Sequence, residues 1–259
     1  MNHIDLHDID LHGLDRMNAL AKELLEDENY FKLPNLRPRD AATLILIDDR
    51  GPAPKVLLGK RHHGHKFLPG KYVFPGGGVE PADQRMPVAR PLDRHAEERL
   101  MRAVKRPSPD QARALALTAI RETYEETGLL LGAPGSTTAG TPPGAWAAFA
   151  QAQILPDLAT IHFVARAITP PRRPRRFDTR FFAADAGAIA HRVEGMIGPD
   201  AELVELIWMP IGQARCLDVP AITAVVLEEL EARIAAGLAH DLPVPFYQMR
   251  HRRFVRELL

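Results

Sequence analysis

Short apolar runs alternate along the middle of this chain with turn-forming and charged segments. Residues 41–48 and 56–60 are rich in Leu, Ile and Val, and Asp48-Asp49-Arg50-Gly51-Pro52 between them is typical of a turn. This pattern predicts two strands joined as a hairpin. Three further strands are predicted from apolar or alternating runs over residues 160–168, 177–182 and 202–208.

Helical spacing of apolar residues appears towards both ends of the chain. Residues 14–25 predict an amphipathic helix within an N-terminal leader, residues 1–40. Residues 219–236 carry an apolar stripe and end at Gly237, which predicts a second amphipathic helix. The main domain is therefore expected over residues 41–240. The last residues, 241–259, are expected to be a C-terminal tail.

A third predicted helix carries acidic residues on one side. Ser108-Pro109-Asp110-Gln111 is typical of a helix start with a capping box, and Gly128 is a natural end. Near that end, Glu122, Glu125 and Glu126 are spaced i, i+3 and i+4, so their carboxylates share a face. Like charges this close destabilise a helix unless a cation lies between them, and oxygen ligands favour Mg²⁺ or Mn²⁺.

A glycine-rich segment precedes this helix in the sequence, Phe74-Pro75-Gly76-Gly77-Gly78-Val79-Glu80. Three consecutive glycines predict a sharp turn at which the main chain approaches a bound group closely, because no Cβ intervenes. A carbonyl of Gly76 or Gly77 is a candidate further metal ligand. Backbone of this kind facing an acidic, metal-loaded helix indicates chemistry on a phosphate ester or anhydride.

Together these segments resemble the Nudix box of the Nudix hydrolases. Gly77 matches the first glycine of the motif, and Asp83 stands where the family has Glu. The second half of the motif is matched by Arg121, Glu122, Glu125, Glu126, Gly128 and Leu129. Thr123 replaces an apolar residue of the motif, and the spacing between the two halves is about 30 residues longer than in the family. An insertion at this point is similar to that of the peroxisomal-type coenzyme A diphosphatases.

The resemblance implies an α/β fold, with a mixed β-sheet in an α/β/α sandwich. It also implies a pyrophosphohydrolase that acts on phosphorus-containing acid anhydrides. Glu122, Glu125, Glu126 and Gly77 would bind Mg²⁺ or Mn²⁺, and Arg121 would hold these carboxylates in orientation. Candidates for the general base are Glu80, Asp83, Glu125 and Glu205.

Substrate contacts are expected around the glycine segment. The candidate substrate-binding residues are Arg61, Phe74, Gly76, Gly78, Glu80 and Asp83. Arg61 belongs to a basic patch with His62, His63, His65 and Lys66. The insertion, residues 84–107, contains a predicted helix over 92–104 and is interpreted either as a lid or as a surface helix. Phe177 to Phe182, a run similar to one in the insertion-bearing subset, is placed near the site as a hypothesis, with core packing as the alternative.

The implied substrate is a nucleoside diphosphate linked to another moiety, with coenzyme A or its acyl derivatives first. ADP-ribose, dinucleotides, nucleotide sugars and a non-catalytic nucleotide sensor are the alternatives. Sensors of this family usually lose an acidic residue of the motif, and this chain keeps all three glutamates. Homodimerisation is an expectation from the family.

Composition excludes several other classes of partner. The 33 basic and 33 acidic residues give no net charge, so nothing directs the whole chain to nucleic acid or to a membrane surface. The basic run from Arg172 to Arg176 is short and interrupted by Pro174. No apolar run is long enough for a membrane span. The single cysteine, Cys216, excludes an internal disulfide and fits a reducing cytoplasm.

Overall fold

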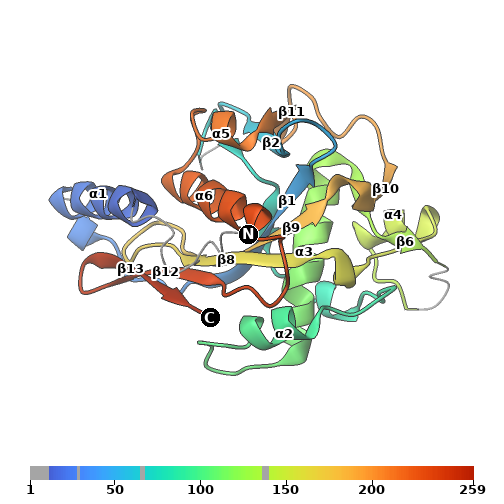
Figure 1. Cartoon of the computed structure of the whole chain (residues 1–259), viewed down its shortest axis with the longest axis horizontal. Coiled ribbons are helices and arrows are strands. Elements are labelled where there is room, and N and C mark those ends of the chain that lie inside the picture. The colour runs from blue at the N-terminus through green and yellow to red at the C-terminus, as the bar shows by residue number, and fades with distance from the viewer. Residues whose placement is uncertain (1–11, 28–29, 65–67, 136–139) are drawn as a thin grey trace.

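The computed structural model describes residues 12–27, 30–64, 68–135 and 140–259. Its α-helices are α1 (His12–Glu26), α2 (Arg94–Leu100), α3 (Pro109–Thr127), α4 (Trp146–Gln151), α5 (Ile211–Ala214) and α6 (Ala221–Ala235). A mixed sheet of nine strands lies between these helices (Figure 1). The predicted sandwich of a mixed sheet between helices is confirmed.

The main sheet has the order β11-β2-β1-β9-β8-β12-β13, with β3 paired to β2 and β4 paired to β1. Its strands are β1 (Arg39–Asp48), β2 (Lys55–Arg61), β3 (Tyr72–Val73), β4 (Gly76–Gly78), β8 (His162–Ile168), β9 (Phe177–Asp185), β11 (Leu203–Pro210), β12 (Pro245–Arg250) and β13 (Arg253–Leu258). The pairs β1–β9 and β12–β8 are parallel, and the others are antiparallel. The predicted β1–β2 hairpin is confirmed.

Two small sheets lie beside the main one and were not predicted. β5 (Leu129–Leu131) pairs with β10 (Ile189–Arg192), and β6 (Ala133–Pro134) pairs with β7 (Ile154–Leu155). Strands this short carry too few residues for a pattern to be recognised in the sequence.

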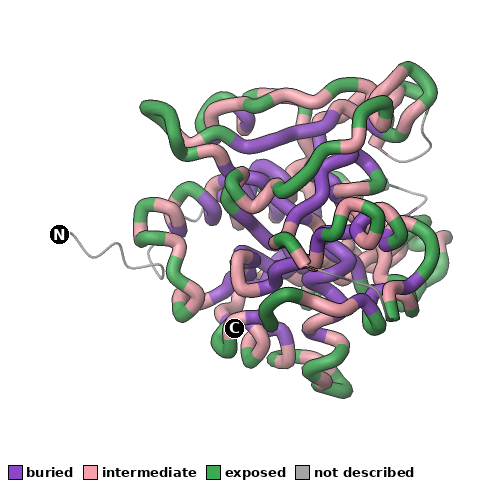
Figure 2. Tube along the Cα trace, turned by 90° about the vertical axis from the view of Figure 1, so that its right-hand side faces the viewer, coloured by how far each residue is buried: buried purple, intermediate pink, exposed green. Residues whose placement is uncertain are grey.

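Two apolar cores form on opposite sides of the sheet. On the α3 face, Leu44, Leu46 and Phe182 pack with α3 and α4. On the α6 face, Ile45 and Phe181 pack with α1 and α6. Alternation along β1 and β9 produces this division, as predicted for the 177–182 strand. Figure 2 shows the buried chain concentrated in the interior, with exposed segments around it.

The two ends of the chain are integrated into the domain. The C-terminal segment, expected to be a tail, instead forms β12 and β13, and β12 pairs with β8. Phe246, Tyr247 and Phe254 are buried there. The C-terminal segment is buried by residues far away in the chain, such as those of β8, and the local sequence does not reveal these contacts. The predicted leader helix is present as α1, and its Met17 and Ala21 are buried against the α6 face.

The insertion is a packed part of the domain. Its helix α2 is shorter than predicted, and Ala96 and Leu100 lie in the α3-face core. Arg99 donates to the carbonyls of His240 and Asp241, and Arg166 on β8 donates to that of Arg102. The segment lies beside the N-terminal end of α3 (Figure 1), whereas the glutamates are near the other end. This placement favours neither a lid nor a merely decorative helix.

Within the described residues, no helix is both long and apolar enough to span a membrane.

Candidate active site

Helix α3 carries the acidic residues in its last turns. Gly128 ends the helix in the left-handed conformation, at φ 77°, and its N–H donates to the carbonyl of Tyr124 at 2.7 Å. The start differs in detail from the prediction, because the Ser108 side chain makes no capping bond. The Gln111 side chain instead donates to Asp40 on β1, at 3.2 Å. The capping box is therefore absent, and Gln111 links the helix to the sheet.

The three glycines form a strand rather than the predicted sharp turn. β4 pairs antiparallel with β1, with Gly78 opposite Ala41 and Gly76 opposite Thr43. The close approach expected of glycine is nevertheless present. A Cβ on Gly77 would lie 2.3 Å from a carboxylate oxygen of Glu122, and one on Gly76 would lie 2.6 Å from the Ala42 carbonyl. Glycine is needed at these positions because Glu122 and the β1 backbone lie too close for a Cβ.

The ladder between β1 and β4 decides which carbonyls face outward. Leu44 donates to the Pro75 carbonyl, and Val79 donates to the Asp40 carbonyl. Hydrogen-bonded and non-hydrogen-bonded pairs alternate along antiparallel strands, so Ala42 and Gly77, which lie between these two pairs, are also a hydrogen-bonded pair. The N–H and C=O of Gly77 are therefore turned towards β1. Those of Gly76 and Gly78 point away from it. Among the glycines, the geometry favours Gly76 over the predicted Gly77 as a carbonyl ligand, since the Gly78 carbonyl already accepts from Arg121.

Arg121 lies at the centre of the site and is only 2% exposed. Its guanidinium donates to Asp83 at 2.8 and 3.1 Å, to the Gly78 carbonyl at 2.8 Å, to Glu122 at 2.9 Å and to Glu125 at 2.6 Å. Burial opposes the charge, but the bonds to Asp83 and the neighbouring carboxylates raise the pKa of Arg121 overall. The predicted orienting role agrees with this geometry.

Asp83 occupies a position that the sequence did not predict. The residue is 0% exposed, and besides Arg121 its carboxylate accepts from the Glu80 N–H, the Thr118 hydroxyl and the Trp146 indole N–H. A carboxylate so enclosed does not agree with the expected substrate contact or with a general base. Nothing in the sequence indicated that Thr118 and Trp146 contact Asp83, because they lie 35 and 63 positions away from it.

Glu122 and Glu126 are carboxylates in an unfavourable environment. Burial raises the pKa of the Glu122 carboxyl to about 7, against the opposing effect of Arg121. Burial, together with Glu202 and Glu122, raises the pKa of Glu126 well above its ordinary value, and only one oxygen has support, from the Gly76 N–H. The other, Oε2, is buried without a hydrogen-bond partner among the described residues.

The donor chemistry fits a hard divalent cation. Glu126 Oε2 and the Glu122 carboxylate are oxygen donors, and both glutamates would be stabilised in their charged form by a cation. In the described residues no three His, Cys, Asp or Glu side chains are gathered into a metal-holding cluster, and Arg121 donates to both Glu122 and Glu125. Glu125 is the more accessible of these acids, with 41% of its side chain exposed.

The remaining predicted residues are dispersed around this centre. Arg61 pairs with Glu202 at 2.8 Å and lies close enough to Glu126 to lower its pKa. Phe74 is buried in the α6-face core, so its predicted substrate contact does not agree with its position. Glu205 accepts from the Tyr72 hydroxyl at 3.4 Å. His65 and Lys66, from the predicted basic patch, lie outside the described residues.

A polar hollow adjoins β4 and the start of the insertion. Its volume is about 630 Å³, and Arg37, Arg39, Glu80 and Gln111 are among the residues that line it. Glu80 is exposed and lines this hollow, and its predicted contact with a substrate stays a prediction.

Comparisons with known proteins place the chain in one family. It is 30% identical to a NUDIX hydrolase from Alicyclobacillus acidocaldarius of known crystal structure, with a TM-score of 0.56, and the match covers 74% of this chain and 90% of that one. It is 34% identical over 132 residues to an acyl-coenzyme A diphosphatase, NUDT19, from Gallus gallus. That match covers 39% of this chain and about a third, 35%, of the curated relative. No protein-family model matches the chain.

Proposed function

The chain belongs to the Nudix hydrolase family, and from that premise we propose that it hydrolyses the pyrophosphate bond of coenzyme A or its acyl derivatives. The products would be a phosphopantetheine, acylated or free, and adenosine 3′,5′-bisphosphate. The bacterial crystal structure supports the family over most of the chain. The choice of substrate is supported by the Gallus gallus relative and by the insertion between the two halves of the motif.

The main support for this function is the burial of the Glu126 carboxylate. This carboxylate is buried beside the glycine strand with one oxygen lacking a partner among the described residues, and its charge is therefore costly. Such a group is kept in a fold more readily when a bound cation compensates it. Glu122, one turn earlier on the helix, accepts from Arg121, but burial still raises the pKa of its carboxyl to about 7.

We propose that Glu122, Glu125, Glu126 and the Gly76 carbonyl would hold Mg²⁺ or Mn²⁺. The cation supplies charge neutralisation at the phosphates and activation of water. Arg121 orients Glu122 and Glu125, and Asp83 fixes Arg121. Because its carboxylate is fully buried and accepts hydrogen bonds from Arg121, Thr118 and Trp146, Asp83 leaves the set of candidate bases. The set retains Glu80, Glu125 and Glu205.

A substrate panel with product identification tests this function. Coenzyme A, octanoyl-coenzyme A, ADP-ribose, a diadenosine polyphosphate and a nucleotide sugar would be incubated with the protein and Mg²⁺ or Mn²⁺, and the products separated by chromatography. We expect adenosine 3′,5′-bisphosphate from the coenzyme A substrates and no turnover in EDTA. Faster cleavage of ADP-ribose, a dinucleotide or a nucleotide sugar would overturn the substrate assignment, and no cleavage of any compound would overturn the hydrolase assignment.

We also propose a cytoplasmic location. Its support is the use of cysteine, a single residue that is free and exposed in the structure.

A further inference from the structure

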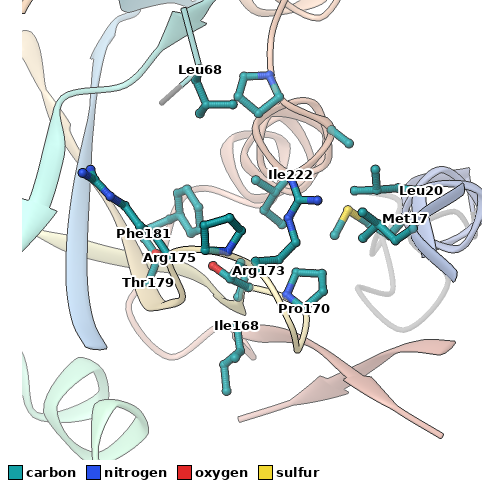
Figure 3. Close-up of a pocket in the computed structure, with 16 residues that line it drawn as sticks. Met17, Leu20, Leu68, Ile168, Pro170, Arg173, Arg175, Thr179, Phe181 and Ile222 are labelled. Atoms are coloured by element: carbon teal, nitrogen blue, oxygen red, sulfur yellow. The ribbon is translucent and has the colours of Figure 1, made fainter. Parts of the chain in front are cut away.

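A largely apolar cavity lies on the α6 face of the sheet, apart from the acidic site. Its volume is about 600 Å³, and α1, α6, β8 and β9 contribute to its walls. In Figure 3, Met17 and Leu20 of α1 face Ile222 of α6 across it, with Phe181 and Leu68 on the other sides. A cavity of this size is within the range that accommodates a small organic ligand.

Strand pairing aligns one wall of the cavity with the glycine strand β4. Thr179, which lines it, is opposite Ala41 on β1, and Ala41 is opposite Gly78 on β4. Two strand spacings, about 10 Å, therefore separate the cavity wall from Gly78. Gly77 faces Glu122 on the α3 face, so alternation turns the side-chain position of Gly78 to the α6 face. The space there is open, since a Cβ on Gly78 would meet nothing within 4 Å.

Two arginines add positive charge to this largely apolar cavity. Arg173 and Arg175 lie on the β8–β9 connection, line the cavity and are exposed. Neither forms an ion pair within the described part of the chain. Arg173 extends towards Ile222, and Arg175 extends over β1, in the direction of the glycine strand (Figure 3). Their neighbours Arg172 and Arg176 are instead bound to backbone carbonyls and to Asn35.

We propose that this cavity binds the acyl end of the substrate, while Arg175, which extends towards the glycine strand, contacts its phosphate groups. The inference rests on the proposed function, which places the pyrophosphate at the glycine strand. A ligand that is apolar at one end and anionic at the other matches the apolar walls together with the exposed Arg175, which has no ion-pair partner among the described residues. A ligand extending about 10 Å from Gly78 across the α6 face reaches the cavity. The cavity thus sets a preference for acylated over free coenzyme A.

A cavity-filling variant tests the proposal. Leu20→Trp places a larger side chain in the cavity, and Leu36→Trp makes the same change at a residue that is 43% exposed and outside it. Affinity for octanoyl-coenzyme A and for coenzyme A would be measured by calorimetry in EDTA, so that no turnover is required. The ratio of kcat/KM for the two compounds would be measured with Mn²⁺.

In the wild type we expect octanoyl-coenzyme A to bind about tenfold more tightly than coenzyme A, because burying methylene groups is favourable. Leu20→Trp should reduce this advantage to about twofold or less and leave coenzyme A binding unchanged. Leu36→Trp should retain it. If thermal melting shows that Leu20→Trp is not folded, Ile222→Trp, on the opposite wall, takes its place. An advantage that persists in the folded cavity variant, or that is absent from the wild type, overturns the proposal.

A substitution of Arg175 tests the phosphate contact independently. Arg175→Ala should weaken the binding of both compounds about equally, by about fivefold or more, because both carry the same phosphates. Arg253→Ala, at an exposed arginine on β13, is the matched control and should change neither. Unaltered binding in Arg175→Ala would overturn the proposed phosphate contact.

The two proposals fail separately in these measurements. If the panel shows no hydrolysis but the acyl-dependent affinity in EDTA is lost in Leu20→Trp, the cavity assignment stands and the hydrolase assignment falls. If coenzyme A is hydrolysed but the acyl group has no effect on affinity, the hydrolase assignment stands and the cavity assignment falls.

Discussion

The two faces of the central sheet differ in what they bury: charged side chains on the α3 face, and apolar side chains around a cavity on the α6 face. On the α3 face, Arg121, Asp83, Glu122 and Glu126 bring charges together in a largely buried place. On the α6 face, apolar residues of α1, α6, β8 and β9 surround a cavity, and the arginines at its margin are exposed. The first arrangement costs stability, and under the proposed function a bound cation offsets that cost. The second is the cavity that we propose to bind the apolar part of the substrate.

The faces also differ in how they respond to pH. The raised pKa of Glu122 belongs to the α3 face. On the α6 face, at the end of α6, His162 stacks on His240 with ring centroids 4.1 Å apart. Burial, followed by the charges of His240 and Arg233, lowers the pKa of His162 to about 4. One face therefore favours the protonated form of an acid, and the other favours the neutral form of a base.

The largest expected effect is on activity and concerns the α3 face. Glu126→Gln should lower kcat by about 10³-fold, because it removes a proposed cation ligand. In the metal-free protein the same change should leave the free energy of unfolding unchanged or raise it, since it removes a costly buried charge. Steady-state kinetics and urea unfolding measure the two effects.

Glu98→Gln is the control for Glu126→Gln. This acid forms an exposed pair with Arg94 on α2, away from the site, and its loss should change activity by less than about twofold. Full activity in Glu126→Gln would contradict the metal assignment.

The second effect is on stability. Asp83→Ala should lower the free energy of unfolding by about 3 kcal/mol, because it leaves the buried Arg121 without its main partner. Urea unfolding at neutral pH gives this value. Asp241→Ala, at an exposed acid, should cost less than about 0.5 kcal/mol. Equal stability of the two variants would show that the charges on the α3 face are not coupled as the structure indicates.

The third effect separates the faces by pH, in EDTA. The folded pKa of Glu122 lies above its ordinary value of 4.5, so its contribution to stability is present below pH 4.5 and is lost as pH rises towards 7. The folded pKa of His162 lies below its ordinary value of 6.5, so its contribution is present above pH 6.5 and is lost as pH falls towards 4.

Substitution should expose these opposite slopes. His162→Gln should make stability fall more steeply with rising pH between 4.5 and 6.5, and Glu122→Gln should make it rise more steeply. Each change amounts to about 2 kcal/mol after allowance for solvent screening. Urea unfolding at several pH values measures the slopes, and slopes equal to that of the wild type would refute the environments described for these groups.

The smallest effect concerns the glycine strand between the two faces. In Gly77→Ala the new Cβ meets the Glu122 carboxylate, which must move, so we expect about a tenfold loss of kcat. The cost in stability should be small, because the end of a flexible side chain gives way. Gly78→Ala meets open space and should keep the melting temperature of the wild type. A large loss of stability in Gly78→Ala would mean that the α6 side of β4 is filled.

Much of the fold and the acidic site was predictable because the relevant signals are local. A helix that ends at Gly128 and carries glutamates at i, i+3 and i+4 needs only the helical repeat for its acids to share a face. Alternation in the 177–182 strand likewise predicted its two faces. The motif brought the glycine segment and this helix together by resemblance, although the insertion separates them in the sequence.

Tertiary structure alone decided how these parts are used. Asp83 is enclosed by Thr118 and Trp146, and Gly76 rather than Gly77 points its carbonyl outward, because pairing with β1 fixes the strand. The C-terminal segment became β12 and β13, and the cavity was assembled from α1, α6 and the β8–β9 region. Contacts between distant residues depend on where the whole chain packs. Local composition and periodicity carry no information about them.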